Sequence, residues 1–206
     1  MLKHILLDFG GVLYNIDYHR AISELAKLSN NPDKLLSLSF EEIFHLPQEL
    51  ETGFASESEF RDMLRDKFDI DADNAKIDKA WNSMLLGLKG SALEFVSALK
   101  EEYSVYLVSN TNSIHYAEFI LECSAFMTYF DKAYLSYKIG VRKPDSSFFE
   151  FIGNDIGFQK NEAVFIDDSL INIKGALDHG WQAIHFTDDS TLSDILHTIK
   201  NLPQRI

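Results

Sequence analysis

Short hydrophobic runs alternate with longer amphipathic stretches along most of this chain. Five of the runs read as strands buried in a sheet, where hydrophobic residues follow one another without alternation. Strands that alternate with helices favour a parallel sheet with right-handed crossovers. The pattern therefore predicts a three-layer α/β/α, Rossmann-like core around a five-stranded parallel sheet. The predicted strands are His4–Asp8, Val105–Ser109, Lys132–Ser136, Ala163–Asp167 and Ala183–Phe186.

Helix signals separate the later strands. Ser91 and Glu94 have the spacing of a capping box and open a helix that extends to about Glu102. Gly180 closes a helix that begins at Ser169, as glycine commonly does after a helix. The remaining helices predicted here are Asn112–Ser124, a helix that Asp145 caps and that ends near Gly153 or Gly157, and Leu192–Lys200.

The segment between the first strand and Ser91 breaks this alternation. It contains no convincing strand, and Ser56 and Glu59 form a second capping box sequence within it. We therefore expect an all-α cap of residues 14–90 inserted into a core of residues 1–13 and 91–206. An insertion at this place can act as a lid that excludes water. Its predicted helices are Tyr18–Leu28, Asp33–Leu38, Phe40–His45, Glu57–Phe68 and Ala75–Leu88.

Polar residues follow four of the predicted strands. Asp8 ends the first strand, Ser109-Asn110-Thr111 the second and Asp167-Asp168 the fourth, while Lys143 lies in the loop beyond the third. Open α/β sheets bind ligands at this carboxyl edge, so we expect these groups to meet there. A carboxylate can act as a nucleophile, and a lysine can stabilise developing negative charge. Two or three carboxylates also favour a Mg²⁺ site.

Four segments carry a resemblance to a known family. In their order along the chain they resemble the four motifs of the haloacid dehalogenase superfamily, and the resemblance covers essentially the whole chain. The position of the helical insertion is similar to the first cap type of that family, and Glu51-Thr-Gly-Phe54 resembles the cap's substrate-specificity loop. The four segments are Asp8-Phe-Gly-Gly-Val, Ser109-Asn-Thr, Arg142-Lys-Pro-Asp145 and Phe165-Ile-Asp-Asp-Ser169.

The resemblance implies a role for each motif residue. Asp8 would be the nucleophile that forms an aspartyl-phosphate, and Lys143 would steady both Asp8 and the phosphate. The phosphoryl group would be bound by Ser109, Asn110, Lys143 and Gly11. Asp168 would bind Mg²⁺ directly. Asp167 would either support the direct ligands without touching the metal or be a further ligand. Asp8 and the backbone carbonyl of Gly10 would complete the protein's part of the metal site.

Position 10 departs from the commonest phosphatase pattern, which has an aspartate there as general acid and base. Gly10 has no side chain to protonate a leaving group, and such help is typically worth about 10²–10⁴ in rate. Its carbonyl can still bind a metal. One explanation is a substrate with a good leaving group, such as a sugar 1-phosphate. Another is that Asp17 supplies the proton from the junction of cap and core.

The leading hypothesis is a Mg²⁺-dependent phosphomonoester hydrolase that acts on a small phosphorylated metabolite. One alternative is a 2-haloacid dehalogenase, in which the same aspartate attacks carbon. Asp167 and Asp168 argue against it, because they would repel Asp8 and an anionic substrate unless a cation neutralised them. A non-catalytic phosphate-binding or regulatory domain is the other alternative, and only Gly10 favours it.

Composition limits the classes of binding partner and the cellular compartment that we expect for this protein. The chain has 206 residues and a net charge of −13, which repels nucleic acids and anionic membranes. Its single cysteine, Cys123, excludes an intrachain disulfide and reads as a buried structural thiol, so we expect a cytoplasmic protein. Asp8 interrupts the first apolar stretch, so no signal peptide is expected. The sequence leaves the oligomeric state open.

Overall fold

A five-stranded parallel sheet forms the centre of the computed structural model, which describes residues 1–202. The strand order is β5-β4-β1-β6-β7, and β1 pairs on one side with β4 and on the other with β6. The five predicted strands are confirmed, with bounds that differ by one residue at most. They are β1 (His4–Leu7), β4 (Ser104–Ser109), β5 (Lys132–Leu135), β6 (Ala163–Asp167) and β7 (Gln182–His185).

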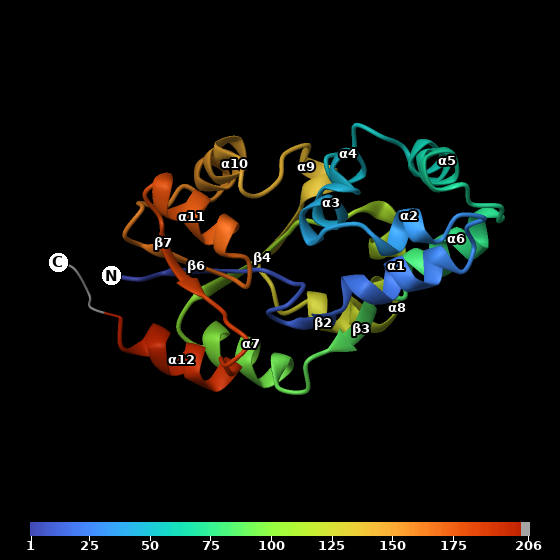
Figure 1. Cartoon of the computed structure of the whole chain (residues 1–206). Helices are drawn as coiled ribbons and strands as arrows, with labels where there is room; N and C mark the ends of the chain where they lie inside the picture. The colour runs from blue at the N-terminus through green and yellow to red at the C-terminus, as the bar shows by residue number, and fades with distance from the viewer. Residues whose placement is uncertain (203–206) are drawn as a thin grey trace.

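Helices cover both faces of this sheet (Figure 1). Ile5 and Leu7 of β1 pack toward α7 (Ala92–Lys100), α8 (Ser113–Met127) and α12 (Leu192–Lys200). Leu6 points to the other face, toward α10 (Ser146–Ile156) and α11 (Leu170–Asp178). This alternation follows from the two-residue period of a strand and confirms the three layers. Cys123 of α8 is buried in the first cluster, as predicted.

The inserted segment forms a second body of helices with its own hydrophobic core (Figure 1, right). Leu25, Leu64 and Trp81 are buried at its centre. The capping box predicted at Ser56 is formed, whereas the side chain of Ser91 makes no capping hydrogen bond. The helices are α1 (Tyr18–Ala26), α2 (Asp33–Leu36), α3 (Phe40–His45), α4 (Gln48–Glu51), α5 (Glu57–Phe68) and α6 (Asn74–Asn82), with α9 (Ser136–Ile139) facing α4 from the core.

The prediction that residues 14–90 contain no strand is wrong at both ends of the segment. β2 (Tyr14–Ile16) pairs antiparallel with β3 (Leu85–Leu88), and the helix predicted to reach Leu88 stops at Asn82. The segment that leaves the core, β2, and the segment that returns to it, β3, lie side by side, so their backbones hydrogen-bond to each other. Cap and core are therefore joined by a two-stranded ribbon. The division at residues 14 and 90 stays a prediction.

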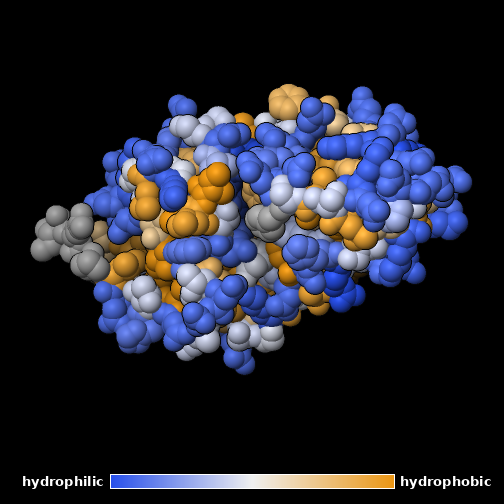
Figure 2. Space-filling view, viewed as in Figure 1, coloured by the Kyte–Doolittle hydropathy of each residue, from blue (hydrophilic) through white to orange (hydrophobic). Residues whose placement is uncertain are grey.

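The surface of the molecule is mainly hydrophilic on the face in Figure 2, in keeping with the high charge. Hydrophobic side chains gather on that face over α11, where Leu170, Ile171 and Leu177 are exposed. Within residues 1–202, no helix has the length and apolar character needed to cross a membrane.

Candidate active site

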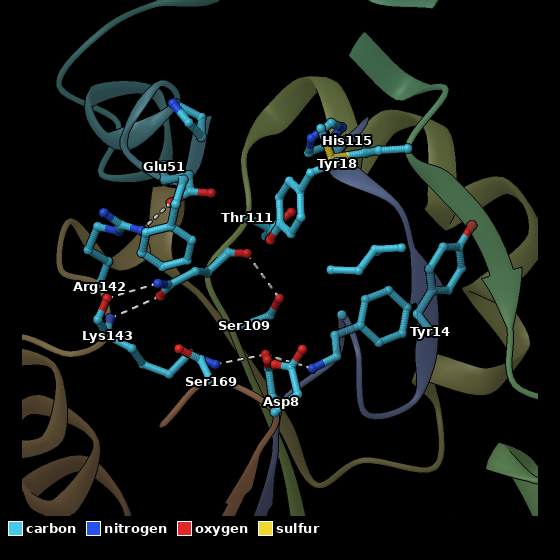
Figure 3. Close-up of a pocket in the computed structure, with 18 of the residues that line it drawn as sticks. Asp8, Tyr14, Tyr18, Glu51, Ser109, Thr111, His115, Arg142, Lys143 and Ser169 are labelled. Carbon is cyan, nitrogen blue, oxygen red and sulfur yellow. Dashed lines mark hydrogen bonds and ion pairs between the residues drawn. The ribbon is translucent and has the colours of Figure 1, made fainter. Parts of the chain in front are cut away.

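The carboxyl ends of β1, β4 and β6 bring the predicted polar residues to one edge of the sheet. Asp8 follows β1, Ser109 ends β4 and Asp167 ends β6. Asp8 and Ser109 are almost fully buried and line a cavity of about 320 Å³. The inserted helices supply the opposite wall of this cavity (Figure 3). A cavity of this size suits a small molecule.

Lys143 is the centre of the charged groups below this cavity, and its side chain is fully buried. Its ammonium has an acceptor for each of its three N–H bonds. It donates to the Val108 carbonyl at 2.9 Å and to Asp167 at 2.7 Å, and it lies 2.7 Å from Asp8 Oδ1. Burial alone lowers the pKa of Lys143, but the two carboxylates outweigh it and raise the pKa above its ordinary value. Lys143 therefore stays charged and has a fixed position.

The side chain of Asn110 holds the backbone of Lys143. Its Nδ2 donates to the Lys143 carbonyl, its Oδ1 accepts from the Lys143 N–H, and both distances are 2.9 Å. The Asn110 side chain therefore positions Lys143, while Asn110 also lines the cavity and its part in phosphate binding stays a prediction. The sequence contained no signal for this contact between residues in different motifs.

Three carboxylates form a cluster beside Lys143. Asp8, Asp167 and Asp168 each place one oxygen so that the three lie within 4.8 Å of one another. Both oxygens of Asp167 are paired, Oδ2 with Lys143 and Oδ1 with the Ser169 N–H and with Asn172. The Asp168 carboxylate lines the cavity and accepts no hydrogen bond from another side chain among residues 1–202. Asp168 is thus the more available ligand of the adjacent pair.

Burial and mutual repulsion disfavour the charged forms of these acids. Burial raises the pKa of Asp8 well above its ordinary value; Asp167 and Asp168 raise it further, and Lys143 opposes them. Burial, reinforced by Asp167, raises the pKa of Asp168 to about 6. A divalent cation would remove this repulsion, and hard oxygen donors are the ligands that Mg²⁺ prefers. The donor set therefore fits Mg²⁺.

The two glycines after Phe9 have different surroundings. Gly11 has a φ of +74°, and a Cβ there would lie 1.9 Å from Asp168 Oδ2, so only glycine fits. Its N–H donates to the Tyr14 carbonyl at 2.8 Å, and the predicted part of Gly11 in phosphate binding stays a prediction. Gly10 lines the cavity, and a Cβ on it would lie 3.1 Å from Ile16. No side chain at position 10 supplies an acid.

Asp17 lies directly before α1, outside the set of residues that line the cavity. It caps α1, and its side chain accepts from the His19 N–H at 3.0 Å. A short polar side chain before a helix commonly satisfies a free backbone N–H in this way, which favours a structural role, and the proton-donor role of Asp17 stays a prediction.

Two charged residues at the junction of cap and core, to which no catalytic or ligand-binding role was assigned from the sequence, also line the cavity. Glu51 of α4 and Arg142 of the loop before Lys143 form an ion pair of 2.9 Å across the junction of cap and core (Figure 3). Arg142 lies in the third motif segment and Glu51 in the segment that resembles the cap's substrate-specificity loop, and these positions were the only signals that could have found them. His115 also lines the cavity, stacks on Trp81 and is neutral, because burial lowers its pKa to about 3.

Comparison with known proteins agrees with this geometry. The family model of the haloacid dehalogenase-like hydrolases matches residues 2–180. This chain belongs to that family. The family assignment suggested by the four motifs is therefore confirmed.

Individual relatives of this hydrolase cover nearly its whole length. A D-ribitol-5-phosphate phosphatase from Bacteroides thetaiotaomicron is 34% identical over 180 residues, which are 84% of this chain and 86% of that protein. The structure of a wild-type HAD family enzyme from the same organism, in complex with magnesium and inorganic phosphate, superposes with a TM-score of 0.80. It is 32% identical and covers 95% of this chain and 99% of its own. A HAD-like hydrolase from Porphyromonas gingivalis shares the fold, with a TM-score of 0.81, 22% identity and coverage of 98% and 99%.

The stability of the hydrolase is expected to depend on pH through Glu51. Burial raises the pKa of Glu51 from its ordinary 4.5 to about 7, against the attraction of Arg142 and Lys143. The folded protein therefore holds this proton more tightly than the unfolded chain does. The stability that Glu51 contributes is complete below pH 4.5 and is lost as the pH rises through 7. The pKa difference corresponds to about 3 kcal/mol.

Glu51→Gln removes this titration. We expect the free energy of unfolding of the variant minus that of the parent to rise by up to about 3 kcal/mol between pH 4.5 and pH 8. Urea unfolding at several pH values measures this difference. Glu49→Gln on the same helix is the matched control, since Glu49 is exposed. A relative stability of Glu51→Gln that does not change over this range would contradict the prediction.

Proposed function

We propose that this hydrolase is a Mg²⁺-dependent phosphomonoester hydrolase that acts on a small phosphorylated metabolite through an aspartyl-phosphate on Asp8. The observation that carries the proposal is the buried ammonium of Lys143, held between Asp8 and Asp167 with Asp168 beside them. This arrangement directs one carboxylate, Asp8, into a cavity whose floor also carries Ser109. The family assignment and the relative named as a phosphatase support it.

Asp8 performs the covalent chemistry in this proposal. One carboxylate oxygen attacks phosphorus, the ester bond to the alcohol oxygen breaks, and that oxygen leaves as an alkoxide that takes its proton from water. Water then attacks the phosphorus of the aspartyl-phosphate, which releases inorganic phosphate and restores the Asp8 carboxylate. Ser109 binds the phosphoryl oxygens, and Lys143 holds Asp8 in place and offsets negative charge. Its three fixed contacts mean that little reorganisation is needed during the reaction.

Asp8, Asp168 and the Gly10 carbonyl would hold Mg²⁺. Asp167 would not bind the metal directly, because its oxygens are already paired with Lys143, Ser169 and Asn172. When bound, Mg²⁺ supplies positive charge that offsets the charge of the acids and of the phosphate. The similar enzyme from Bacteroides thetaiotaomicron, crystallised with magnesium and inorganic phosphate, supports this assignment.

The leaving group sets a second requirement, because Gly10 has no acidic side chain and Asp17 is not among the residues that line the cavity. A sugar 1-phosphate, whose oxygen leaves more readily, would meet it and stays a prediction. The relative at 34% identity is named for the phosphate ester of a primary alcohol, ribitol. That name favours a broader proposal, in which the substrate is a small alcohol phosphate.

A panel of phosphate esters tests the proposed function. We expect phosphate release from aryl, alkyl, sugar and polyol phosphates only with Mg²⁺, and a loss of at least about 100-fold when EDTA removes the metal, because the clustered acids then repel the substrate. Adding excess Mg²⁺ should restore the rate. Phosphate release that is unchanged by EDTA would contradict the metal assignment.

Two results would instead favour the other interpretations. Chloride release from a 2-chloro acid without Mg²⁺ would indicate a dehalogenase. A panel in which no ester releases phosphate faster than with Asp8→Asn would indicate a domain that binds phosphate without turning it over.

A further inference from the structure

A partly buried lysine outside the cavity contacts the turn that follows the proposed nucleophile. Lys89 lies between β3, by which the chain returns from the cap, and α7 (Figure 1). Its ammonium donates to the Gly11 carbonyl, and its backbone N–H donates to the Leu13 carbonyl at 2.9 Å. Lys89 is not among the residues that line the cavity. It therefore holds the turn at two points without reaching the substrate.

The surroundings of the Lys89 ammonium fix its position without an ion pair. The ammonium lies 4.3 Å from the centre of the Phe186 ring, whose face attracts a cation. Among the residues that the structure describes, it has no carboxylate within ion-pair distance, and its hydrogen-bond acceptor is the Gly11 carbonyl. Burial lowers the pKa of Lys89, and the negative charges of Asp168 and Asp188 oppose this effect. The side chain thus binds one backbone carbonyl beside the cluster of acids.

The turn that Lys89 holds has a backbone with unusual freedom, because it contains two successive glycines. Gly10 lines the cavity, and its carbonyl is a proposed Mg²⁺ ligand. The Gly11 N–H belongs to the same planar trans peptide as that carbonyl, so the two point in opposite directions. Gly11 is fixed at both ends, since its N–H donates to the Tyr14 carbonyl and its own carbonyl accepts from Lys89. These two contacts therefore determine where the Gly10 carbonyl points.

We propose that Lys89 is a positioning residue of the metal site, which directs the Gly10 carbonyl and keeps Gly11 against Asp168 by binding the Gly11 carbonyl. This inference rests on the proposed function, because it concerns the Mg²⁺ site described there. Lys89 directly follows β3, so it also connects the segment that returns from the cap to the turn that carries a metal ligand.

Two roles for Lys89 predict opposite changes in Mg²⁺ affinity when the lysine is removed. If it only adds positive charge near Asp168, its removal makes the site more negative, and Mg²⁺ binds more tightly. If it positions the turn, its removal frees the Gly10 carbonyl, and Mg²⁺ binds more weakly. Loss of a group that orients a metal ligand typically lowers affinity by about 10–100-fold. The direction of the change therefore distinguishes the two roles.

Calorimetric titration with Mg²⁺ alone, at pH 8 and without substrate, measures this change. We expect Lys89→Met to raise the Kd for Mg²⁺ by at least about tenfold. Lys89→Arg keeps a charged donor that can lie over an aromatic ring, and its Kd should stay within about threefold of the parent value. The matched control is Lys160→Met, because Lys160 also donates to a backbone carbonyl, that of His179, and neither residue lines the cavity. This control should leave the Kd unchanged.

Hydrogen exchange of the parent protein gives a second measurement that needs no variant. If the position of the turn sets the affinity for Mg²⁺, then Mg²⁺ also stabilises the turn, because coupling between two sites is reciprocal. Saturating Mg²⁺ should therefore slow exchange of the Lys89 amide, which donates to Leu13. Exchange in α12, which supplies no residue to the cavity, should not change.

The results separate this inference from the proposed function. Mg²⁺ binding by Lys89→Met that is as tight as in the parent, or tighter, would overturn the inference and leave the phosphatase intact. If no ester releases phosphate, the proposed activity fails, and the Mg²⁺ titrations still decide the role of Lys89. A parent protein that binds no Mg²⁺ overturns both. Circular dichroism reports whether Lys89→Met folds; if it does not, slower exchange of the Lys89 amide with Mg²⁺ supports the inference, and unchanged exchange overturns it.

Discussion

Replacing Asp8 by asparagine is expected to lower the rate of phosphate release by at least about 10⁴-fold. The asparagine amide is not a nucleophile, and loss of a catalytic nucleophile elsewhere has lowered kcat by about 10⁶. The substitution preserves the size of the side chain and an oxygen that can accept from the Phe9 N–H, which donates to Asp8 Oδ1 at 2.7 Å. Phosphate release with saturating ester and Mg²⁺ measures the effect.

Binding experiments distinguish a lost nucleophile from a damaged site. Asp8→Asn removes one negative charge from the cluster of three acids, so inorganic phosphate should bind to the variant at least as tightly as to the parent. The matched control is Asp178→Asn, which changes an exposed acid on α11 and should leave turnover unchanged. A residual rate within tenfold of the parent would exclude Asp8 as the nucleophile.

The sheet could be predicted because each of its strands carries its own local signal. β1 and β6 are buried on both faces, so their sequences are continuous hydrophobic runs followed by an acid. Parallel pairing then places Asp8 and Asp167 at one edge without further information. The ribbon of β2 and β3 carries no such signal, because Leu85–Leu88 reads as a continuation of the preceding helix. Its pairing partner lies about 70 residues earlier in the chain, where periodicity does not reach.

The same distinction applies to the candidate site. Residue type and strand-end position were enough to select Asp8, Ser109, Lys143 and Asp168, which the fold does bring together. The use of a side chain by a distant backbone was not predictable: nothing in the sequence indicates that the Asn110 amide pairs with the Lys143 backbone. The contact of Glu51 with Arg142 likewise depends on how the cap sits on the core. Polar residues with more than one chemically reasonable partner need the structure to decide between them.

Replacing Lys143 by methionine is expected to destabilise the protein by about 3–5 kcal/mol. The variant retains the volume of the side chain but leaves Asp8 and Asp167 buried, close together and without their cation. Removal of one member of a buried charge group typically has an effect of this size, because the remaining charges cannot recover their hydration. Urea unfolding at pH 8 measures the loss, and Lys174→Met, an exposed lysine on α11, is the matched control.

A double-mutant cycle identifies the carboxylates as the origin of this loss. In the Asp8→Asn background one of the two buried charges is already absent, so Lys143→Met should be less destabilising there by at least about 1 kcal/mol. Lower pH should also reduce the loss, since protonated acids no longer repel each other. Mg²⁺ should stabilise Lys143→Met more than it stabilises the parent, because the metal replaces the missing positive charge beside the acids. Additive effects of the two substitutions would show that Lys143 acts through packing alone.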